Sequence, residues 1–82
     1  MDQVRHVVRQ TAGECGLHQL TLHRAGGRVC VSFHCRMPQE TPVSRAHDLT
    51  MAMENALRNR LPEITRVTIH MEPETPPPAM EP

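Results

Sequence analysis

The chain has 82 residues, with nine Arg balanced by nine Asp and Glu and no Lys, so its formal net charge is zero when histidine is neutral. This balance, together with one Phe and no Tyr or Trp, argues against nucleic-acid binding, because neither a basic surface nor stacking platforms are present. The length predicts one small domain whose core is marginal in a monomer, so dimerisation or metal binding would supplement it. No apolar run reaches the roughly 20 residues that cross a bilayer, and we expect no direct membrane insertion of this chain.

Residues 2–13 predict a first helix. Its three valines and Thr11 recur at helical spacing, Asp2 suits the amino end, and Gly13 fits the stop. Alternation over residues 17–24 then predicts a strand in which the leucines at positions 20 and 22 share one face. The glycines that follow predict a hairpin turn into a second strand.

The second strand, residues 29–37, alternates cleanly between two faces. We expect a core face of Val29, Val31, Phe33, Cys35 and Met37, and an open face of Cys30, Ser32, His34 and Arg36.

A second helix follows, with Thr41 as the predicted N-cap and Pro42 at the first helical position. Pro62 is expected to end this helix. Its apolar stripe consists of Ala46, Leu49, Met53, Ala56 and Leu57. A third strand, residues 67–72, then alternates up to Pro73, which has no N–H for a sheet ladder.

The predicted order is helix, strand, strand, helix, strand. The second and third strands are joined by a helical crossover, so they should lie parallel and adjacent. The fold class is therefore α+β: a two-layer sandwich with a three-stranded mixed sheet and two helices on one face. We assign residues 1–73 to this domain and residues 74–82 to a flexible Pro-rich tail.

Two histidines and a glutamate are expected on the open face of the sheet. Parity places His34 on the same face as His70 and Glu72, and adjacent strands lie about 4.8 Å apart, so these donors could converge on one ion. The alternative is an ordinary polar sheet face. His18 and His47, each taken alone, are more often surface residues than ligands.

The chain has an odd number of cysteines, Cys15, Cys30 and Cys35, and they form no CxxC motif. Both observations argue against a disulfide framework and for a reducing, cytoplasmic location. Cys35 is expected to be a small buried hydrophobe. Cys15 and Cys30 could be exposed, where they would be soft ligands for zinc or cuprous copper.

Two stretches carry a family resemblance. "GLHQLTLHRAGGRVCVSFHCRM" and "SRAHDLTMAMENALRNRLPEITRVTIHMEP" resemble the cytoplasmic C-terminal domain of the cation diffusion facilitator family of zinc and divalent-cation efflux transporters. The resemblance covers roughly residues 3–73. It rests on the Gly-Leu-His of the first strand, the His near the end of the second, the Ala-His of the second helix, and the final Val-x-Ile-His-x-Glu-Pro.

This resemblance implies a metallochaperone-like, ferredoxin-like domain that forms a V-shaped homodimer below the membrane. Zinc or a similar divalent cation would bind at the subunit interface, tighten the dimer and favour transport by the transporter's own membrane domain. The positions that match family ligands are His18, His34, His47, His70 and Glu72. His18 and His47 enter through the resemblance alone.

Three hypotheses follow. The first is a metal-sensing dimerisation module of a transporter. The second is a free-standing soluble metal carrier or buffer, and the third is a structural dimerisation domain that needs no metal. We do not expect an enzyme, because no orienting group or substrate cleft is evident for a catalytic pair. Which divalent ion binds stays open.

Overall fold

The computed structural model describes residues 2–13 and 15–74. Five elements follow in the predicted order: α1 (Asp2–Thr11), β1 (Gly16–Ala25), β2 (Arg28–Met37), α2 (Val43–Arg60) and β3 (Ile64–Pro73). Of the predicted Pro-rich tail, Glu74 alone is described, and its backbone N–H donates to the carbonyl of Met37. The rest of that tail lies outside the described residues.

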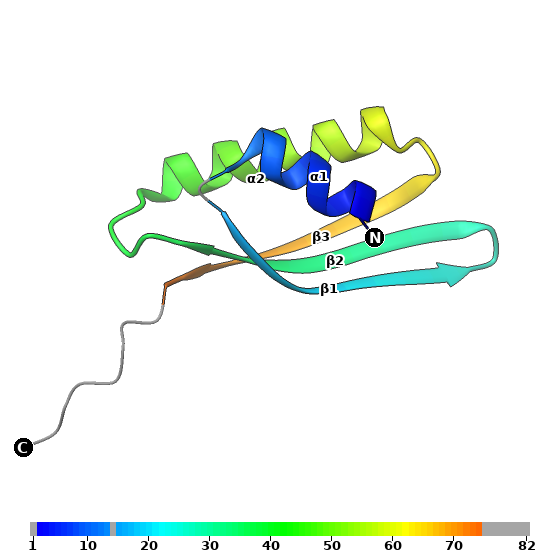
Figure 1. Ribbon diagram of the computed structural model, residues 1–82, viewed down its shortest axis with the longest axis horizontal. Coiled ribbons are helices and arrows are strands. Elements are labelled where there is room, and N and C mark those ends of the chain that lie inside the picture. Colours follow the sequence, from blue (N-terminus) through cyan, green and yellow to red (C-terminus); the bar gives the residue numbers. More distant parts are fainter. Residues whose placement is uncertain (1, 14, 75–82) are drawn as a thin grey trace, which may run out of the picture.

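The three strands form one mixed sheet in the order β1-β2-β3 (Figure 1). β1 and β2 are antiparallel neighbours joined by a hairpin, whereas β2 and β3 are parallel and joined by the crossover through α2. The predicted mixed sheet and its parallel pair are therefore confirmed.

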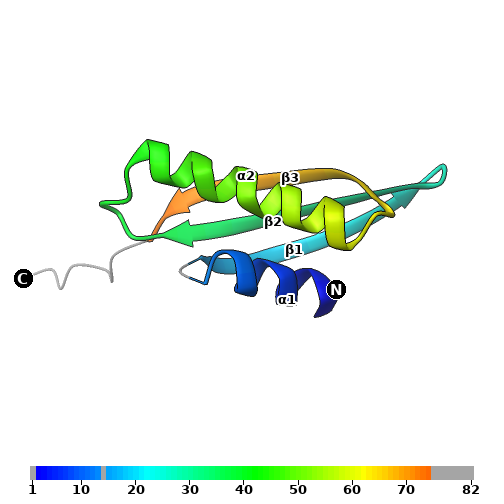
Figure 2. The same ribbon diagram turned by 90° about the horizontal axis from the view of Figure 1, so that it is seen from above.

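Both helices lie on one face of the sheet, with α1 beside α2 (Figures 1 and 2). The core between the two layers is apolar, and among the described residues no polar side chain is buried in it. Phe33, Met53 and Leu57 are fully buried at its centre. The members of the core are Val4, Val7, Val8, Ala12, Val29, Val31, Phe33, Cys35, Met37, Leu49, Met53, Leu57 and Ile64. The opposite face of the sheet is left uncovered by the chain's own helices.

The ends of α2 differ in how well the sequence predicts them. Leu61 precedes Pro62, has a non-helical backbone with φ −129° and ψ 75°, and ends the helix as expected. The N-cap prediction was wrong: the cap residue is Pro42, with φ −64° and ψ 150°, and it makes no side-chain capping bond. Thr41 instead donates its backbone N–H to Pro38 in the preceding turn, so it lies one residue outside the cap.

β1 contains an irregularity that its alternation does not reveal. His18 pairs with His34 and Thr21 pairs with Ser32, so three steps along β1 match two along β2. This is a β-bulge, and Gln19 within it has a φ of 52°, which is uncommon for a residue other than glycine. The bulge reverses parity, so His18 and Leu22 do not share a face as their spacing suggests.

The pairing of the cysteines also differs from the prediction. Cys15, just before β1, is joined by a disulfide to Cys35 of β2, with Cα atoms 5.4 Å apart. Cys30 is free and half-buried. Cys35 is buried as predicted, but the argument against a disulfide framework was wrong, because one bridge and one free thiol also give an odd number of cysteines.

Candidate metal centre

Three histidines form a row across the uncovered face of the sheet. The register places His18 of β1 opposite His34 of β2, and His34 opposite His70 of β3. The rings of His18 and His34 have centroids 5.2 Å apart, and those of His34 and His70 are stacked at 4.8 Å. Alternation in β2 and β3 predicted that His34 and His70 share a face, whereas the bulge in β1 brings His18 beside His34.

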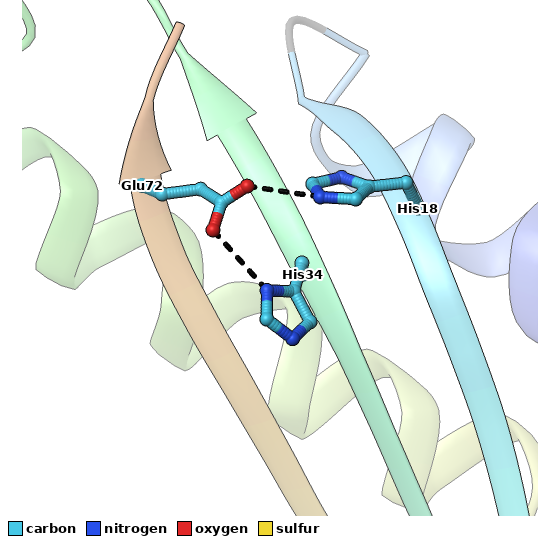
Figure 3. A group of neighbouring side chains, drawn as sticks. All are labelled: His18, His34 and Glu72. Atoms are coloured by element: carbon cyan, nitrogen blue, oxygen red, sulfur yellow. Dashed lines mark hydrogen bonds and ion pairs between the residues drawn. The ribbon is translucent and has the colours of Figure 1, made fainter. Parts of the chain in front are cut away.

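Glu72 connects two members of this row. Its Oε1 lies 2.9 Å from His18 Nε2, and its Oε2 lies 3.2 Å from His34 Nδ1 (Figure 3). One carboxylate from β3 therefore reaches imidazoles on both other strands. All three side chains are half-buried, so a small ion could reach them from solvent.

The charge of Glu72 is stabilised by its neighbours. The hydrogen bond that it accepts from His34 holds the pKa of the Glu72 carboxyl below its ordinary value of 4.5, and the proximity of His18 acts in the same direction. Arg36 adds to this effect, with its Nε 3.5 Å from Glu72 Oε1. Arg36 was not among the predicted site residues, although the parallel register places it directly opposite Glu72.

The donor set fits a transition-metal ion. The candidate ligand atoms of His18, His34 and Glu72 all lie within 4.8 Å of one another. Donors of a tetrahedral zinc ion lie about 3.4 Å apart, given Zn–N and Zn–O bonds of about 2.0 to 2.1 Å. Small side-chain rotations would therefore close two imidazoles and one carboxylate around an ion, leaving a fourth position open.

The orientation of His18 also suits a ligand. Its Nε2 faces Glu72, while its Nδ1 lies 3.4 Å from the carbonyl oxygen of Gly16. A hydrogen on Nδ1 directed to that carbonyl would leave Nε2 free to bind a metal, and such outer contacts commonly orient ligating histidines.

The remaining predicted ligands lie outside this group. His70 stacks on His34, and its nitrogen atoms are not part of the convergent set. His47 is exposed on α2. Within the part of the chain that the structure describes, His18, His34 and Glu72 are the cluster of metal-binding type.

Comparisons with known proteins agree on one family. Residues 1–74 match the family described as "Cation efflux protein, cytoplasmic domain". An uncharacterized transporter of Synechocystis is 41% identical over 56 residues, which are 68% of this chain and 18% of that protein. Metal tolerance protein C1 of Arabidopsis thaliana is 27% identical over 73 residues, or 89% of this chain and 16% of that protein. The chain thus spans less than a fifth of the length of these relatives. None of its described helices is long and apolar enough to cross a membrane.

Solved structures share the fold. The chain superposes on CzrB, described as a candidate zinc transporter, with a TM-score of 0.80 and 34% identity over 90% of this chain and 92% of that one. A second CzrB structure, a Zn form, is 35% identical, with a TM-score of 0.78 over 89% and 83% of the chains. The metal-bound C-terminal domain of the CzcD transporter from Thermotoga maritima gives 0.80 at 25% identity, covering 88% and 84%.

Proposed function

This chain belongs to the family of cation efflux proteins as a cytoplasmic domain, and from that premise we propose that it binds zinc or a similar divalent cation and, as a homodimer, regulates transport by a membrane domain. The observation that carries the proposal is the convergence of His18, His34 and Glu72 from three different strands. Zinc is the first candidate because of the nitrogen and oxygen donors, and because the related CzrB has a zinc form.

The proposed ion would replace the present hydrogen bonds of the site. Glu72 now accepts from imidazole nitrogens, and a divalent ion would take the place of the protons between them. Because imidazole must be deprotonated to bind a metal, the ion and protons compete for the same nitrogen atoms. The Glu72 carboxylate, held in its charged form by Arg36 and the histidines, would be available to the ion without a proton to lose.

The open fourth position is where a second subunit would enter. A donor from the partner, or a water molecule held by it, would complete a tetrahedron. An ion that binds the closed dimer more tightly than the open one shifts their equilibrium by that difference in affinity. The small core of the monomer is a further reason to expect a dimer.

Native mass spectrometry of the chelator-stripped chain, with zinc added stepwise, tests the proposal. We expect a dimer that takes up whole zinc ions. Glu72→Gln keeps the shape of the side chain but removes its charge, and should lose this uptake. Glu74→Gln is the matched control, because Glu74 lies exposed two residues further on and contacts its neighbours through its backbone.

Three other results would contradict the proposal in different ways. A dimer that binds no zinc would leave a structural dimerisation domain. A monomer that binds zinc would indicate a carrier or buffer. Equal zinc uptake by wild type and Glu72→Gln would place the ion elsewhere. In the full-length transporter reconstituted in vesicles, Glu72→Gln should also reduce the dependence of flux on cytoplasmic zinc, whereas an unchanged dependence would refute coupling to transport.

A further inference from the structure

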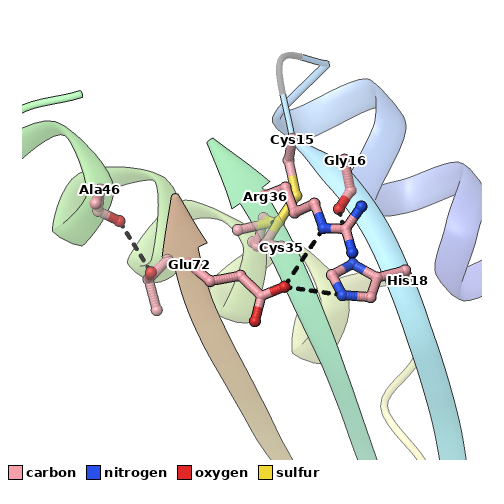
Figure 4. Close-up of a disulfide and its surroundings, with 9 residues drawn as sticks. Cys15, Gly16, His18, Cys35, Arg36, Ala46 and Glu72 are labelled. Atoms are coloured by element: carbon pink, nitrogen blue, oxygen red, sulfur yellow. Dashed lines mark hydrogen bonds and ion pairs between the residues drawn. A yellow bond between two sulfur atoms is a disulfide. The ribbon is translucent and has the colours of Figure 1, made fainter. Parts of the chain in front are cut away.

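The two sulfur atoms of the disulfide differ in their access to solvent. Cys35 is 0% exposed and lies in the core, with its Sγ 3.9 Å from Met53 Sδ. Cys15 is half-buried and lies in the short connection between α1 and β1. Figure 4 shows the bridge beside the start of β1, next to Gly16. A reagent arriving from solvent can therefore reach Cys15 but not Cys35.

A small cavity of about 230 Å³ adjoins Cys15. It is lined by Arg5, Val8, Arg9, Gly13, Cys15 and Leu17. Two of these carry guanidinium groups, from successive turns of α1, and none of the described lining residues is acidic. The cavity therefore combines a positive wall with one edge of a disulfide, which suits a small anionic molecule that carries a thiol.

We propose that the Cys15–Cys35 bridge is a redox-active disulfide, opened and closed at Cys15 by a small anionic thiol that binds in the Arg5 and Arg9 cavity. Glutathione, which carries two carboxylates and one thiol, is of this chemical class. A bridge in a cytoplasmic domain is itself a reason to expect exchange, because cytoplasmic disulfides are usually transient or redox-sensing. The proposal does not depend on metal binding.

The reaction is a thiol–disulfide exchange. The thiolate of the small molecule attacks Cys15 Sγ, a bond forms between those two sulfur atoms, and the bond to Cys35 breaks. The departing electron pair stays on Cys35 Sγ, which takes up a proton. A second thiolate then attacks the small-molecule sulfur of the mixed disulfide. Cys15 leaves as a thiolate and is protonated, and the two small thiols end as their own disulfide. Two electrons pass to the protein, and the reverse sequence reoxidises it.

The surroundings of the two sulfur atoms suit these roles. Cys35 is fixed in β2 and would remain beside Met53 after the bridge opens, ready to re-form it. Cys15 lies outside the regular elements, where a backbone hydrogen bond of 2.9 Å connects its N–H to the Ala12 carbonyl. It could therefore turn toward the cavity when it carries the small molecule.

The test is incubation of the chain, in a Cys30→Ser background without metal, in mixtures of reduced and oxidised glutathione, followed by alkylation and mass spectrometry. We expect conversion between bridged and reduced forms, with a mixed disulfide on Cys15. The double variant Arg5→Gln, Arg9→Gln should slow the reaction with glutathione by about tenfold, as expected for lost electrostatic attraction. The same variant should slow the reaction with 2-mercaptoethanol much less, because its attacking thiolate carries a single negative charge and no carboxylate.

Three results would overturn the proposal. A bridge that glutathione leaves unchanged in every mixture, or a mixed disulfide on Cys35, would refute attack at Cys15. Equal slowing of both thiols in the arginine variant would show a general structural effect and refute the role of the cavity. Circular dichroism of each variant confirms that the fold is retained during the assay.

Discussion

Glu72 gains its position from the parallel pairing of β2 with β3. The register places it opposite Arg36 and two residues beyond the histidine pair, so one carboxylate reaches an arginine and two imidazoles. A carboxylate in such surroundings stays charged in acid to a lower pH than it would in an unfolded chain. The same charge that would attract a divalent ion therefore also favours the folded state.

We expect the contribution of Glu72 to stability to disappear in acid. The folded-state pKa of Glu72 lies below 4.5, so its contribution is complete above that value and is lost as pH falls through the lower, folded-state pKa. Urea unfolding of the metal-free chain at a series of pH values measures this. The difference in the free energy of unfolding between wild type and Glu72→Gln should shrink as pH falls through that window. A difference that stays constant would show that the charge of Glu72 does not support the fold.

His70 shares the ring contacts of the row, but unlike His18 and His34 it has no hydrogen bond or ion pair with Glu72 among the described contacts. Its ring lies 17° from parallel to that of His34. We expect this stack to hold His34 in place. Phenylalanine can stack but cannot bind zinc, so His70→Phe should retain the zinc affinity of wild type, whereas His70→Ala should weaken it. Isothermal titration calorimetry of the two variants separates these roles, and an equal loss in both would instead make His70 a ligand.

The strands show where sequence patterns succeed and where they fail. Alternation in β2 and β3 placed His34, His70 and Glu72 on one face because both strands pair regularly in that region. The same rule fails for His18, since a one-residue slip exchanges the two faces of a strand. Glutamine is not a residue type that favours a positive φ, so Gln19 gave no sign of the bulge. A glycine or asparagine at this position would have suggested one. Only the family resemblance named His18.

The bulge accommodates one extra residue in β1 and so keeps His18 on the open face of the sheet. Deleting Gln19 removes the extra residue and should leave a regular ladder in which His18 still pairs with His34, so we expect a zinc affinity close to that of wild type. Gln19→Gly should keep the bulge, because glycine accepts a φ of 52° without steric cost. Zinc titration of both variants, with circular dichroism as a check of folding, is the measurement. A large loss of zinc affinity in the deletion variant would contradict this and show that the local geometry of the bulge, beyond the pairing of His18 with His34, orients the ligand.

The ends of α2 give a similar contrast. Proline restricts the residue before it through a local steric clash, so the end at Leu61 could be predicted from sequence. The start depends on whether a side-chain oxygen accepts a hydrogen bond from a free backbone N–H of the first turn. Thr41 instead belongs to the turn that begins at Pro38, one residue before the cap. Local sequence patterns thus predict the end of this helix better than its start.

Taken as a whole, the molecule is two layers held by one small apolar core and one covalent bridge. The predicted layers, strand order and core positions agree with the structure because they follow from hydrophobic periodicity. The bridge could not be predicted, since pairing requires the connection before β1 to pass close to the core face of β2. A core of this size gives only a modest margin of stability, so a covalent bridge adds appreciably to it.

Opening the bridge should lower stability substantially. Its two cysteines are 20 residues apart in sequence, and closing a loop of that length restricts the unfolded chain by about 3 kcal/mol. Urea unfolding of a Cys30→Ser chain with and without dithiothreitol gives this difference. The variant Cys15→Ser should match the reduced chain and show no further effect of dithiothreitol. Equal stability of the bridged and reduced forms would mean that the connection before β1 is already fixed by other contacts.

The distribution of the three candidate ligands over β1, β2 and β3 also has a consequence during protein synthesis. The ribosome releases His18 and His34 first, as a hairpin that lacks the carboxylate. Glu72 follows only after the whole of α2, and it arrives beside the imidazoles only when β3 has paired with β2. An unfinished or mispaired chain therefore has no complete site, so zinc in the cytoplasm would be taken up by finished domains and would pass over nascent ones.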